Sequence, residues 1–445
     1  MEKKHSLIKK FKTNNNYYIY NTWTNKILNF LVQLQDKLKV KIQKIMFCLV
    51  LLLSFSVFGQ EKIMISGYVK TIKTEKPIFL ADVFLVNTTL GCATNKDGFF
   101  RITNISPGQY TLIVRMVGYE EYEKKVTLSC KQEEITIYLK EKALQIEGVV
   151  VEAEKPGEWL RNLQKFKRNF FGLSEFADEC EFENPEVLDF SYIPDTLDSV
   201  VGQYVWFRAI AAEPLIFYNK ALGYKYVYYN FKFEVYNPEG ELFYITNKKT
   251  LRGKLNRSGV LRLVDLKPEN LKQQRKWKEN RRKVYRGSFK HLLYSLAKDV
   301  SKDEGFELRE VLRKLGAMGK VIDPKTIVKF DKTNNCYVLT FENIKNISKC
   351  KKIIKIIYKN ERNEIRRKMY NFQISFVPNS GRYKEGKILA GTMYQQSFLE
   401  LKAGECVKFD ERGIIISKKY KRAIPYGYWK WAFSMAEMLP DNYKY

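Results

Sequence analysis

The chain carries a tight turn and a strand in the sequence Asn95-Lys96-Asp97-Gly98-Phe99-Phe100-Arg101-Ile102. Glycine adopts a positive φ without penalty and aspartate hydrogen-bonds its own backbone, so the first four residues favour a turn. Upstream, residues 83–87 alternate with the period of a strand, and downstream Pro107-Gly108 predicts a second turn before a strand at residues 110–114. Two further strands are predicted at residues 126–128 and 135–139. About seven strands in a segment of this length are typical of a β-sandwich.

This segment is similar to the carboxypeptidase-regulatory-like domain in Ser66-Gly67-Tyr68-Val69, Ala81-Asp82-Val83 and Gly108-Gln109-Tyr110. The resemblance implies a small transthyretin-like (prealbumin-like) sandwich, here assigned to residues 60–142, of a kind found in many bacterial envelope proteins. The matching residues are turn and core positions, which specify a fold better than a function. The resemblance therefore implies where the protein works and leaves its ligand open.

An apolar run at residues 45–58 follows Lys37, Lys39, Lys41 and Lys44 and ends at Gly59. A membrane-spanning helix needs about 20 apolar residues, so this run is short for a span. A basic flank, a short apolar core and a small final residue are typical of a signal peptide, and we predict cleavage after Gly59. An uncleaved anchor is the alternative.

Residues 1–59 are thus assigned to a leader and signal peptide, and the protein is expected in the periplasm or at the outer membrane. Residues 1–36 are rich in Asn and Lys, which suggests a mis-set start codon. Cys48 has no lipobox in front of it, so lipid anchoring there is not expected.

The charge balance is strongly basic: 78 Lys and Arg residues stand against 49 Asp and Glu, a formal net charge of +29. Such a balance favours anionic partners. Export argues against nucleic acid, which leaves an outer-membrane or periplasmic protein, or an anionic glycan or glycolipid. Basic residues cluster at 272–286, 349–355 and 366–368. The alternative is that these clusters are solvated faces of a lysine-rich protein.

The cysteines that remain after the predicted cleavage are Cys92, Cys130, Cys180, Cys336, Cys350 and Cys406. An oxidising compartment permits disulfides, but sequence does not choose among the pairings. Cys92 with Cys130, and Cys336 with Cys350, are the first pairs to consider, and buried free thiols are the alternative. The cysteine spacing matches no zinc motif, and no cofactor is predicted.

Residues 143–157 are predicted to form a strand and linker, and residues 158–445 a larger β-rich α+β domain with a few helices. The segment Ala143-Leu144-Gln145-Ile146-Glu147-Gly148-Val149-Val150-Val151 resembles the exit from this sandwich in TonB-dependent receptors, but the remaining chain is too short for a receptor barrel. Trp159, Leu163, Phe166 and Phe170 recur at helical spacing and predict a helix that docks by an aromatic face. A second helix is predicted at residues 429–438, ended by Leu439-Pro440.

Strands of the C-terminal region are predicted from aromatic and β-branched residues. They are expected at residues 204–217, 224–236, 242–251, 307–312, 337–342, 353–358, 372–377, 395–401 and 413–416.

The C-terminal region also resembles uncharacterised envelope proteins that carry the same regulatory-like domain. The similar segments are Glu183-Asn184-Pro185, residues 219–224, residues 277–291, Gly427-Tyr428-Trp429 and residues 439–443. That family has no assigned reaction, so the resemblance implies a fold and a location only.

A candidate anion-binding or partner-binding groove combines Arg281, Arg282, Tyr285, Ser288 and His291. Arginine binds carboxylate or phosphate with two hydrogen bonds, and Ser and His can transfer protons. The competing interpretation is a helix-turn-helix brace packed on a sheet, in which Gly287 ends one helix and Ser288 caps the next, at residues 289–298. The sequence favours the brace.

Enzyme motifs are missing from the sequence. His291 is the single histidine after the signal peptide, so a site with two histidine ligands cannot be built. The acidic pairs Asp303-Glu304 and Asp410-Glu411 lie beside glycine and are interpreted as solvated turns. We therefore predict a non-catalytic accessory or binding protein of the cell envelope. The alternative is a hydrolase of surface glycan that uses two carboxylates, because such a pair need not be close in sequence.

Overall fold

The computed structural model describes residues 35, 39, 43, 63–129, 132–142, 156–172, 174–194, 205–236, 255–311, 318–342, 351–362, 394–402, 404–416, 424–427 and 434–445. Residues 62–445 form one compact unit. The predicted signal peptide and Cys48 lie outside the described residues, as do the linker segment 143–155 and the predicted strands at 242–251 and 372–377. Among the residues described, no helix combines the length and the apolar character needed to cross a bilayer.

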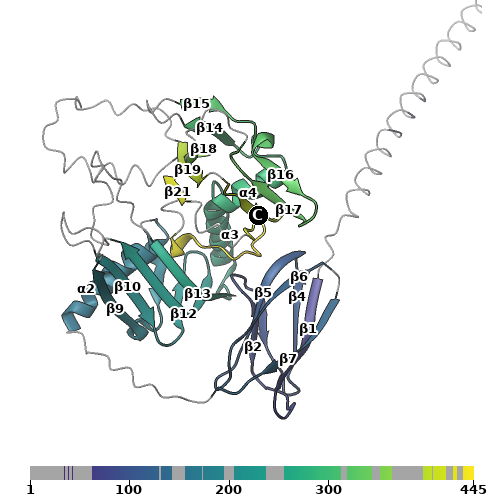
Figure 1. Ribbon diagram of the computed structural model, residues 1–445, viewed down its shortest axis with the longest axis vertical. Helices are drawn as coiled ribbons and strands as arrows, with labels where there is room; N and C mark the ends of the chain where they lie inside the picture. Colours follow the sequence, from purple (N-terminus) through teal and green to yellow (C-terminus); the bar gives the residue numbers. More distant parts are fainter. Residues whose placement is uncertain are drawn as a thin grey trace, which may run out of the picture. The chain divides into compact units, whose positions relative to one another are not determined.

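The N-terminal sandwich has the seven predicted strands in two sheets (Figure 1). One sheet has the order β4-β1-β7 and the other β3-β2-β5-β6. The strands are β1 (Ile63–Thr71), β2 (Asp82–Leu85), β3 (Gly91–Ala93), β4 (Phe99–Ile105), β5 (Gly108–Arg115), β6 (Tyr122–Leu128) and β7 (Gln132–Leu139). β1 and β7 run parallel, and buried aliphatic side chains from both sheets form one core. The predicted turn is present, although the side chain of Asn95, and not of Asp97, accepts the backbone N–H of residue 97 at 3.0 Å.

The next sheet is built around the long strand β12 (Tyr224–Tyr236). One edge of β12 pairs with β11 (Leu215–Asn219) and then with β10 (Val205–Ala211), and the other edge pairs with β13 (Leu255–Asp265). The outer strands are β8 (Cys180–Phe182) and β9 (Leu188–Pro194). The strand predicted at 204–217 is therefore two strands, because Glu213-Pro214 lies in the turn between them.

Helix α2 (Pro156–Phe171) covers this sheet as its aromatic stripe predicts. Leu163, Phe166 and Phe170 are buried, and the half-buried Trp159 donates its indole N–H to the Leu188 carbonyl at 3.1 Å. Phe166 and Phe170 stack at 4.9 Å between ring centroids and meet Phe231 and Phe233 edge-on. The α2 stripe and the inward face of β12 thus create a core rich in phenylalanine.

A third core lies between helix α4 (Phe289–Ala297) and two smaller sheets. The five-stranded sheet has the order β15-β14-β18-β19-β21, and the three-stranded sheet β16-β17-β20. Their strands are β14 (Phe306–Val311), β15 (Met318–Val321), β16 (Val328–Asp331), β17 (Cys336–Leu339), β18 (Lys351–Arg362), β19 (Tyr394–Lys402), β20 (Val407–Phe409) and β21 (Ile424–Gly427). The region predicted as one C-terminal domain therefore contains two hydrophobic cores.

Two predicted elements differ from the structure. Residues 413–416 form no strand, because they turn back after β20 and make a single bridge from Ile415 to Phe409. Within the predicted helix at 429–438, the described part is one turn of 3₁₀-helix, η5 (Met435–Glu437). Three further 3₁₀ turns are η1 (Ala177–Glu179), η2 (Pro185–Val187) and η3 (Pro324–Thr326). The mainly β fold class with an N-terminal sandwich is confirmed.

Candidate functional site

The candidate site is the junction where residues 434–445, called the tail below, enter the phenylalanine-rich core and hydrogen-bond to α4 and to the sandwich. Met435 and Ala436 are buried in the phenylalanine-rich core. Asn219 donates its side-chain N–H to the Ala436 carbonyl at 2.8 Å, and the Tyr226 hydroxyl donates to Met438 at 2.7 Å. The tail then reaches the sandwich, where the backbone N–H of residue 441 donates to the Asn87 carbonyl at 2.8 Å. The tail therefore joins segments that are far apart in sequence.

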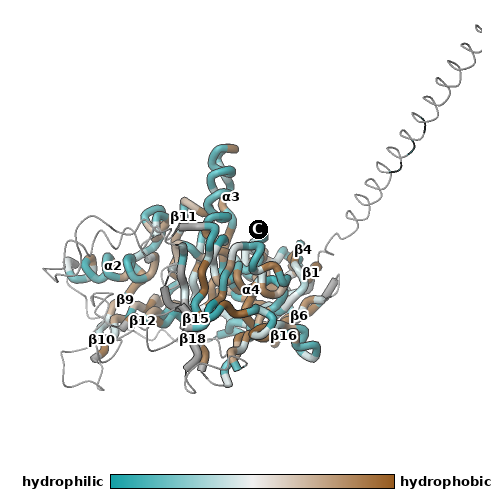
Figure 2. Tube along the Cα trace, turned by 90° about the horizontal axis from the view of Figure 1, so that it is seen from above, coloured by the Kyte–Doolittle hydropathy of each residue, from teal (hydrophilic) through white to brown (hydrophobic). Residues whose placement is uncertain are grey.

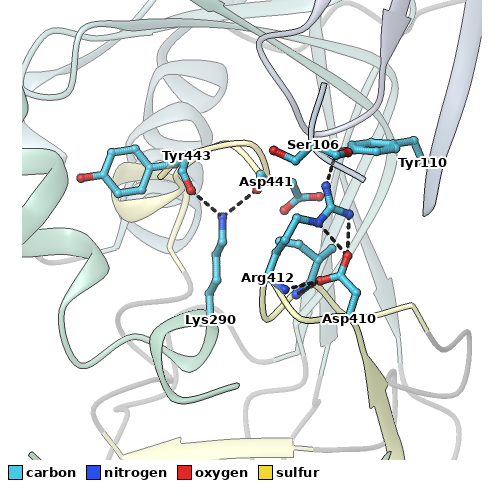
Figure 3. Close-up of polar contacts among 8 residues, drawn as sticks. Ser106, Tyr110, Lys290, Asp410, Arg412, Asp441 and Tyr443 are labelled. Atoms are coloured by element: carbon cyan, nitrogen blue, oxygen red, sulfur yellow. Dashed lines mark hydrogen bonds and ion pairs between the residues drawn. The ribbon is translucent and has the colours of Figure 1, made fainter. Parts of the chain in front are cut away.

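Lys290 of α4 holds the tail by its ammonium group. Its Nζ donates to the carbonyl oxygens of Asp441 and Tyr443 at 2.8 and 3.4 Å (Figure 3). It also donates to the Pro440 carbonyl at 3.2 Å. An ammonium has three N–H donors, so these carbonyls match its hydrogen-bonding capacity. Burial lowers the pKa of Lys290 to about 8, while Asp441 opposes that shift.

The Asp441 side chain lies among charged groups of both signs. Burial raises the pKa of Asp441 to about 6, against the opposing attraction of Lys290 and Arg412. Asp410 adds to the increase in this pKa because it carries like charge. Asp441 therefore titrates closer to neutral pH than an ordinary aspartate.

Arg412 connects the turn after β20 to the sandwich. Its Nε donates to Asp410 Oδ2 at 2.8 Å, and its Nη1 donates to the Tyr110 hydroxyl. Tyr110 in turn donates to the Ser106 carbonyl at 2.8 Å (Figure 3). Gly108 has a φ of +151°, and a Cβ there would lie 2.2 Å from Arg412 Nη2. The Pro107-Gly108 turn therefore allows the guanidinium to approach the backbone.

Asp410 is buried at 8 % exposure, so its interpretation as a solvated carboxylate was wrong. The turn itself is present: Asp410 Oδ1 accepts the backbone N–H groups of Arg412 and Ile414 at 2.9 and 3.0 Å. Its other oxygen forms an ion pair with Arg412. The turn sequence alone does not predict this pair.

The sandwich also pairs directly with β12 and β13. Asp82 forms an ion pair with Arg262, and the Tyr229 hydroxyl donates to Asp82 Oδ2 at 3.3 Å. Along the backbone, the N–H of Asn87 donates to Leu261 at 2.8 Å, and the N–H of Leu263 donates to Thr88 at 3.1 Å. Burial raises the pKa of Asp82 even though Arg262 opposes the shift. Backbone and side-chain bonds thus fix the sandwich to this sheet.

The five residues predicted as a groove have separate positions. Arg281 turns inward on helix α3 (Leu271–Tyr285), donates to the carbonyls of Leu222 and Gly223 at 2.7 and 3.1 Å, and lies 3.9 Å from the Tyr224 ring centroid. Arg282 is exposed, with its guanidinium 5.7 Å from the Tyr445 ring. The two arginines do not face a common ligand position.

Tyr285, Ser288 and His291 lie together at the turn between α3 and α4. Ser288 caps α4 by accepting the backbone N–H of His291 at 3.1 Å. The His291 ring is 2 % exposed, its Nδ1 accepts the N–H of Gly287 at 3.1 Å, and its Nε2 lies 3.2 Å from Glu304. Burial lowers the pKa of His291. Tyr285 is buried and stacks on Tyr445 at 5.1 Å. These contacts are those of a brace, and a binding role for the five residues stays a prediction.

The described cysteines, Cys92, Cys180, Cys336 and Cys406, are free thiols. Cys130 and Cys350, the partners considered for Cys92 and Cys336, lie outside the described residues. Burial raises the pKa of Cys180 to about 12, which keeps this thiol protonated and weakly nucleophilic. Within the described ranges, no group of three or more His, Cys, Asp or Glu is placed to hold a metal ion.

Residues 65–151 match the model of the CarboxypepD_reg-like domain, which confirms the resemblance for this part of the chain. No curated protein matches the chain.

Three solved structures are among those similar to it. A cohesin–X-dockerin complex from Acetivibrio cellulolyticus is 24% identical, with 22% of this chain and 71% of that chain covered and a TM-score of 0.17. A putative membrane-associated protein of unknown function from Bacteroides fragilis is 13% identical, with 47% and 84% covered and a TM-score of 0.15. A putative carbohydrate binding protein from Bacteroides uniformis is 7% identical, with 47% and 100% covered and a TM-score of 0.16. At these TM-scores the likenesses carry no conclusion for this chain.

Proposed function

We propose that the protein is a non-catalytic accessory or binding protein of the bacterial cell envelope, exported to the periplasm or the outer membrane. The sandwich serves in it as a fixed module of a larger binding body. The observation that carries this proposal is the junction. Its charged and buried side chains are of the kind found at functional sites, but they bond within the chain. They are Lys290, Arg412 and Asp82. The predicted signal peptide and the match to the regulatory-like domain support the location.

Crosslinking in cells, followed by mass spectrometry of the fractionated envelope, tests this proposal. We expect the tagged protein in the envelope fraction, crosslinked to an outer-membrane or periplasmic protein or to an envelope glycan. Recovery of an uncrosslinked protein in the soluble periplasm alone would contradict it. A matched variant, Asp82→Asn with Arg262→Gln, weakens the attachment of the sandwich and should change the crosslinked positions.

A hydrolase of surface glycan is the second candidate, and one observation favours it. Asp441 has a raised pKa and lies within electrostatic reach of Asp410, which keeps Arg412 as its partner. Glycoside hydrolysis uses two carboxyl groups, and a raised pKa suits the one that acts as the acid. Glycan and peptidoglycan substrates should be cleaved by the parent chain and not by Asp441→Asn. A blank screen at high protein concentration excludes this candidate.

A further inference from the structure

Helix α3 presents one face to the protein and another to solvent. On the inner face, Trp277 is buried and donates its indole N–H to the Lys220 carbonyl at 2.8 Å, and Asn280 donates to Ala221 at 2.8 Å. The Asn270 side chain caps the helix by accepting the N–H of Gln273 at 2.9 Å. Figure 2 shows one end of α3 projecting beyond the other elements, with hydrophilic residues along most of the helix. Among the described residues, the helix is therefore anchored along one side and exposed along the other.

The outer face of α3 is almost entirely basic. Its exposed charged residues are Lys272, Arg275, Lys276, Lys278, Glu279, Arg282 and Lys283. Lys276 and Lys283 form ion pairs with Glu179 and Glu175. Within the part of the chain that the structure describes, no acidic side chain pairs with Lys272, Arg275 or Lys278. At 100° per residue these three cations lie on the same side of the helix as Arg282. Glu279 lies between Arg275 and Lys272 on this side, so the face has a net positive charge but contains one carboxylate.

Leu271 lies within this positive face. It is the first residue of α3 and its side chain is 70 % exposed. The helical period places it between Lys278 and Arg282 around the axis. An exposed apolar residue surrounded by cations suits the boundary between lipid headgroups and acyl chains, where apolar groups insert and cations meet phosphates. A soluble polyanion would engage the cations but would gain little from the leucine.

We propose that the outer face of α3, defined by Leu271, Lys272, Arg275, Lys278 and Arg282, docks onto an anionic lipid surface through phosphate-bearing headgroups. This inference rests on the proposed envelope location and names the partner of that surface. The charge complementarity is direct, because Lys272, Arg275 and Lys278 are exposed and have no acidic partner among the described residues, in a chain of formal net charge +29. The sequence-predicted groove included Arg282 of this face, but Arg281 points the other way.

Vesicle binding by the full chain tests the proposal, with phosphatidylcholine vesicles that contain or lack phosphatidylglycerol. The test variant combines Lys272→Gln, Arg275→Gln and Lys278→Gln. Each basic residue near an anionic surface contributes about fivefold in affinity, so we expect roughly 100-fold weaker binding to the anionic vesicles at low salt. The matched control combines Lys96→Gln, Lys124→Gln and Lys125→Gln, which removes the same charge from exposed positions of the sandwich and should bind like the parent. The apolar run at residues 45–58 is common to all variants, so only differences among variants matter.

Leu271→Ser separates a lipid surface from a soluble polyanion. It should weaken binding to anionic vesicles severalfold and leave binding to inorganic polyphosphate unchanged. Equal loss in the test and control variants, or no effect of Leu271→Ser on vesicle binding, would overturn the proposal. Thermal unfolding of each variant, expected to match the parent, ensures that lost binding is not lost folding. Envelope crosslinking reports separately on the proposed function, so that proposal can stand if vesicle binding fails.

Discussion

Asp441 shows at the level of a single residue how the junction responds to pH. Its ordinary pKa of 3.8 is raised to about 6 in the folded chain. Between about pH 4 and 6 the folded chain therefore binds more protons than the unfolded chain, and stability falls as pH rises through this window. At neutral pH Asp441 is mostly ionised, and ionisation costs more free energy in the folded chain than in the unfolded chain.

Asp441→Asn should consequently raise the free energy of unfolding at pH 7 by roughly 2 kcal/mol and reduce the fall in stability between pH 4 and 6. Urea unfolding at several pH values measures both quantities. Asp303→Asn, at an exposed position, is the control and should leave the pH profile of the parent unchanged. A variant at 441 with the parent's slope would show that this carboxyl is not buried in solution.

Gly223 is a second residue whose contribution can be tested. It lies at the contact between α3 and β12. Its φ is +70°, and a Cβ there would lie 2.3 Å from the Trp277 ring. Gly118 has a similar φ of +84° with nothing within 4 Å of the corresponding Cβ position. Gly118→Ala should therefore cost only the backbone strain, about 1 kcal/mol, whereas Gly223→Ala adds overpacking of roughly 1–3 kcal/mol. Chemical denaturation of the two variants measures the difference, and equal losses would mean that Trp277 moves aside freely.

At the level of elements, the turn between α3 and α4 depends on the Ser288 cap. The hydroxyl accepts the backbone N–H of His291, which has no partner within the helix. Ser288→Ala should lower the free energy of unfolding by about 1 kcal/mol, and Ser288→Asp should retain most of it because aspartate is also a good cap. Thermal unfolding of both variants checks this. Equal destabilisation by Ala and Asp would point to a packing defect instead.

Sequence predicted the elements whose signal is local. The stripe of α2, the strand at 224–236 and the cap at Ser288 each follow from side chains a few residues apart, and each is present. A helix was predicted at residues 429–438, ended by Leu439-Pro440, yet Met435 and Ala436 form a short 3₁₀ turn that is buried in a core built from distant segments. Tertiary contacts override local propensity there.

The candidate site escaped prediction for the same reason. Lys290 and Asp441 are 151 positions apart in sequence, and neither belongs to a catalytic or binding motif. The one available signal was Leu439-Pro440-Asp441-Asn442-Tyr443, a segment that resembles other envelope proteins but has no role assigned by that resemblance. The Asp441 carboxyl and the backbone carbonyls of this segment find their partners only in the folded chain, where α4 and the sandwich lie beside them.

At the level of the whole molecule, the tail links the sandwich to the two C-terminal cores. Removal of residues 439–445 would abolish the bonds from Lys290 to the tail and from the 441 N–H to Asn87. We expect hydrogen exchange of the Asn87 and Leu263 amides to accelerate about tenfold or more. These amides pair the sandwich with β13, and without the tail that pairing should open more often. Mass spectrometry of exchange measures this.

Asn442→Ala is a milder control, since it removes only the bonds to Thr89 and should accelerate exchange less. Unchanged exchange in the truncated chain would show that Asp82, Arg262 and the backbone pairing hold the sandwich unaided.

The parallel pairing of β1 and β7 has a mechanical consequence. Residues 64–71 pair in register with residues 132–139, so the first and last strands of the sandwich lie side by side and point the same way. Tension applied between residues 63 and 139 pulls these strands in opposite directions along their length. The ladder bonds are then loaded together in shear and must break at once, instead of opening one after another like a zip. The sandwich should therefore resist stretching strongly, with a rupture force that single-molecule pulling between those two residues would measure.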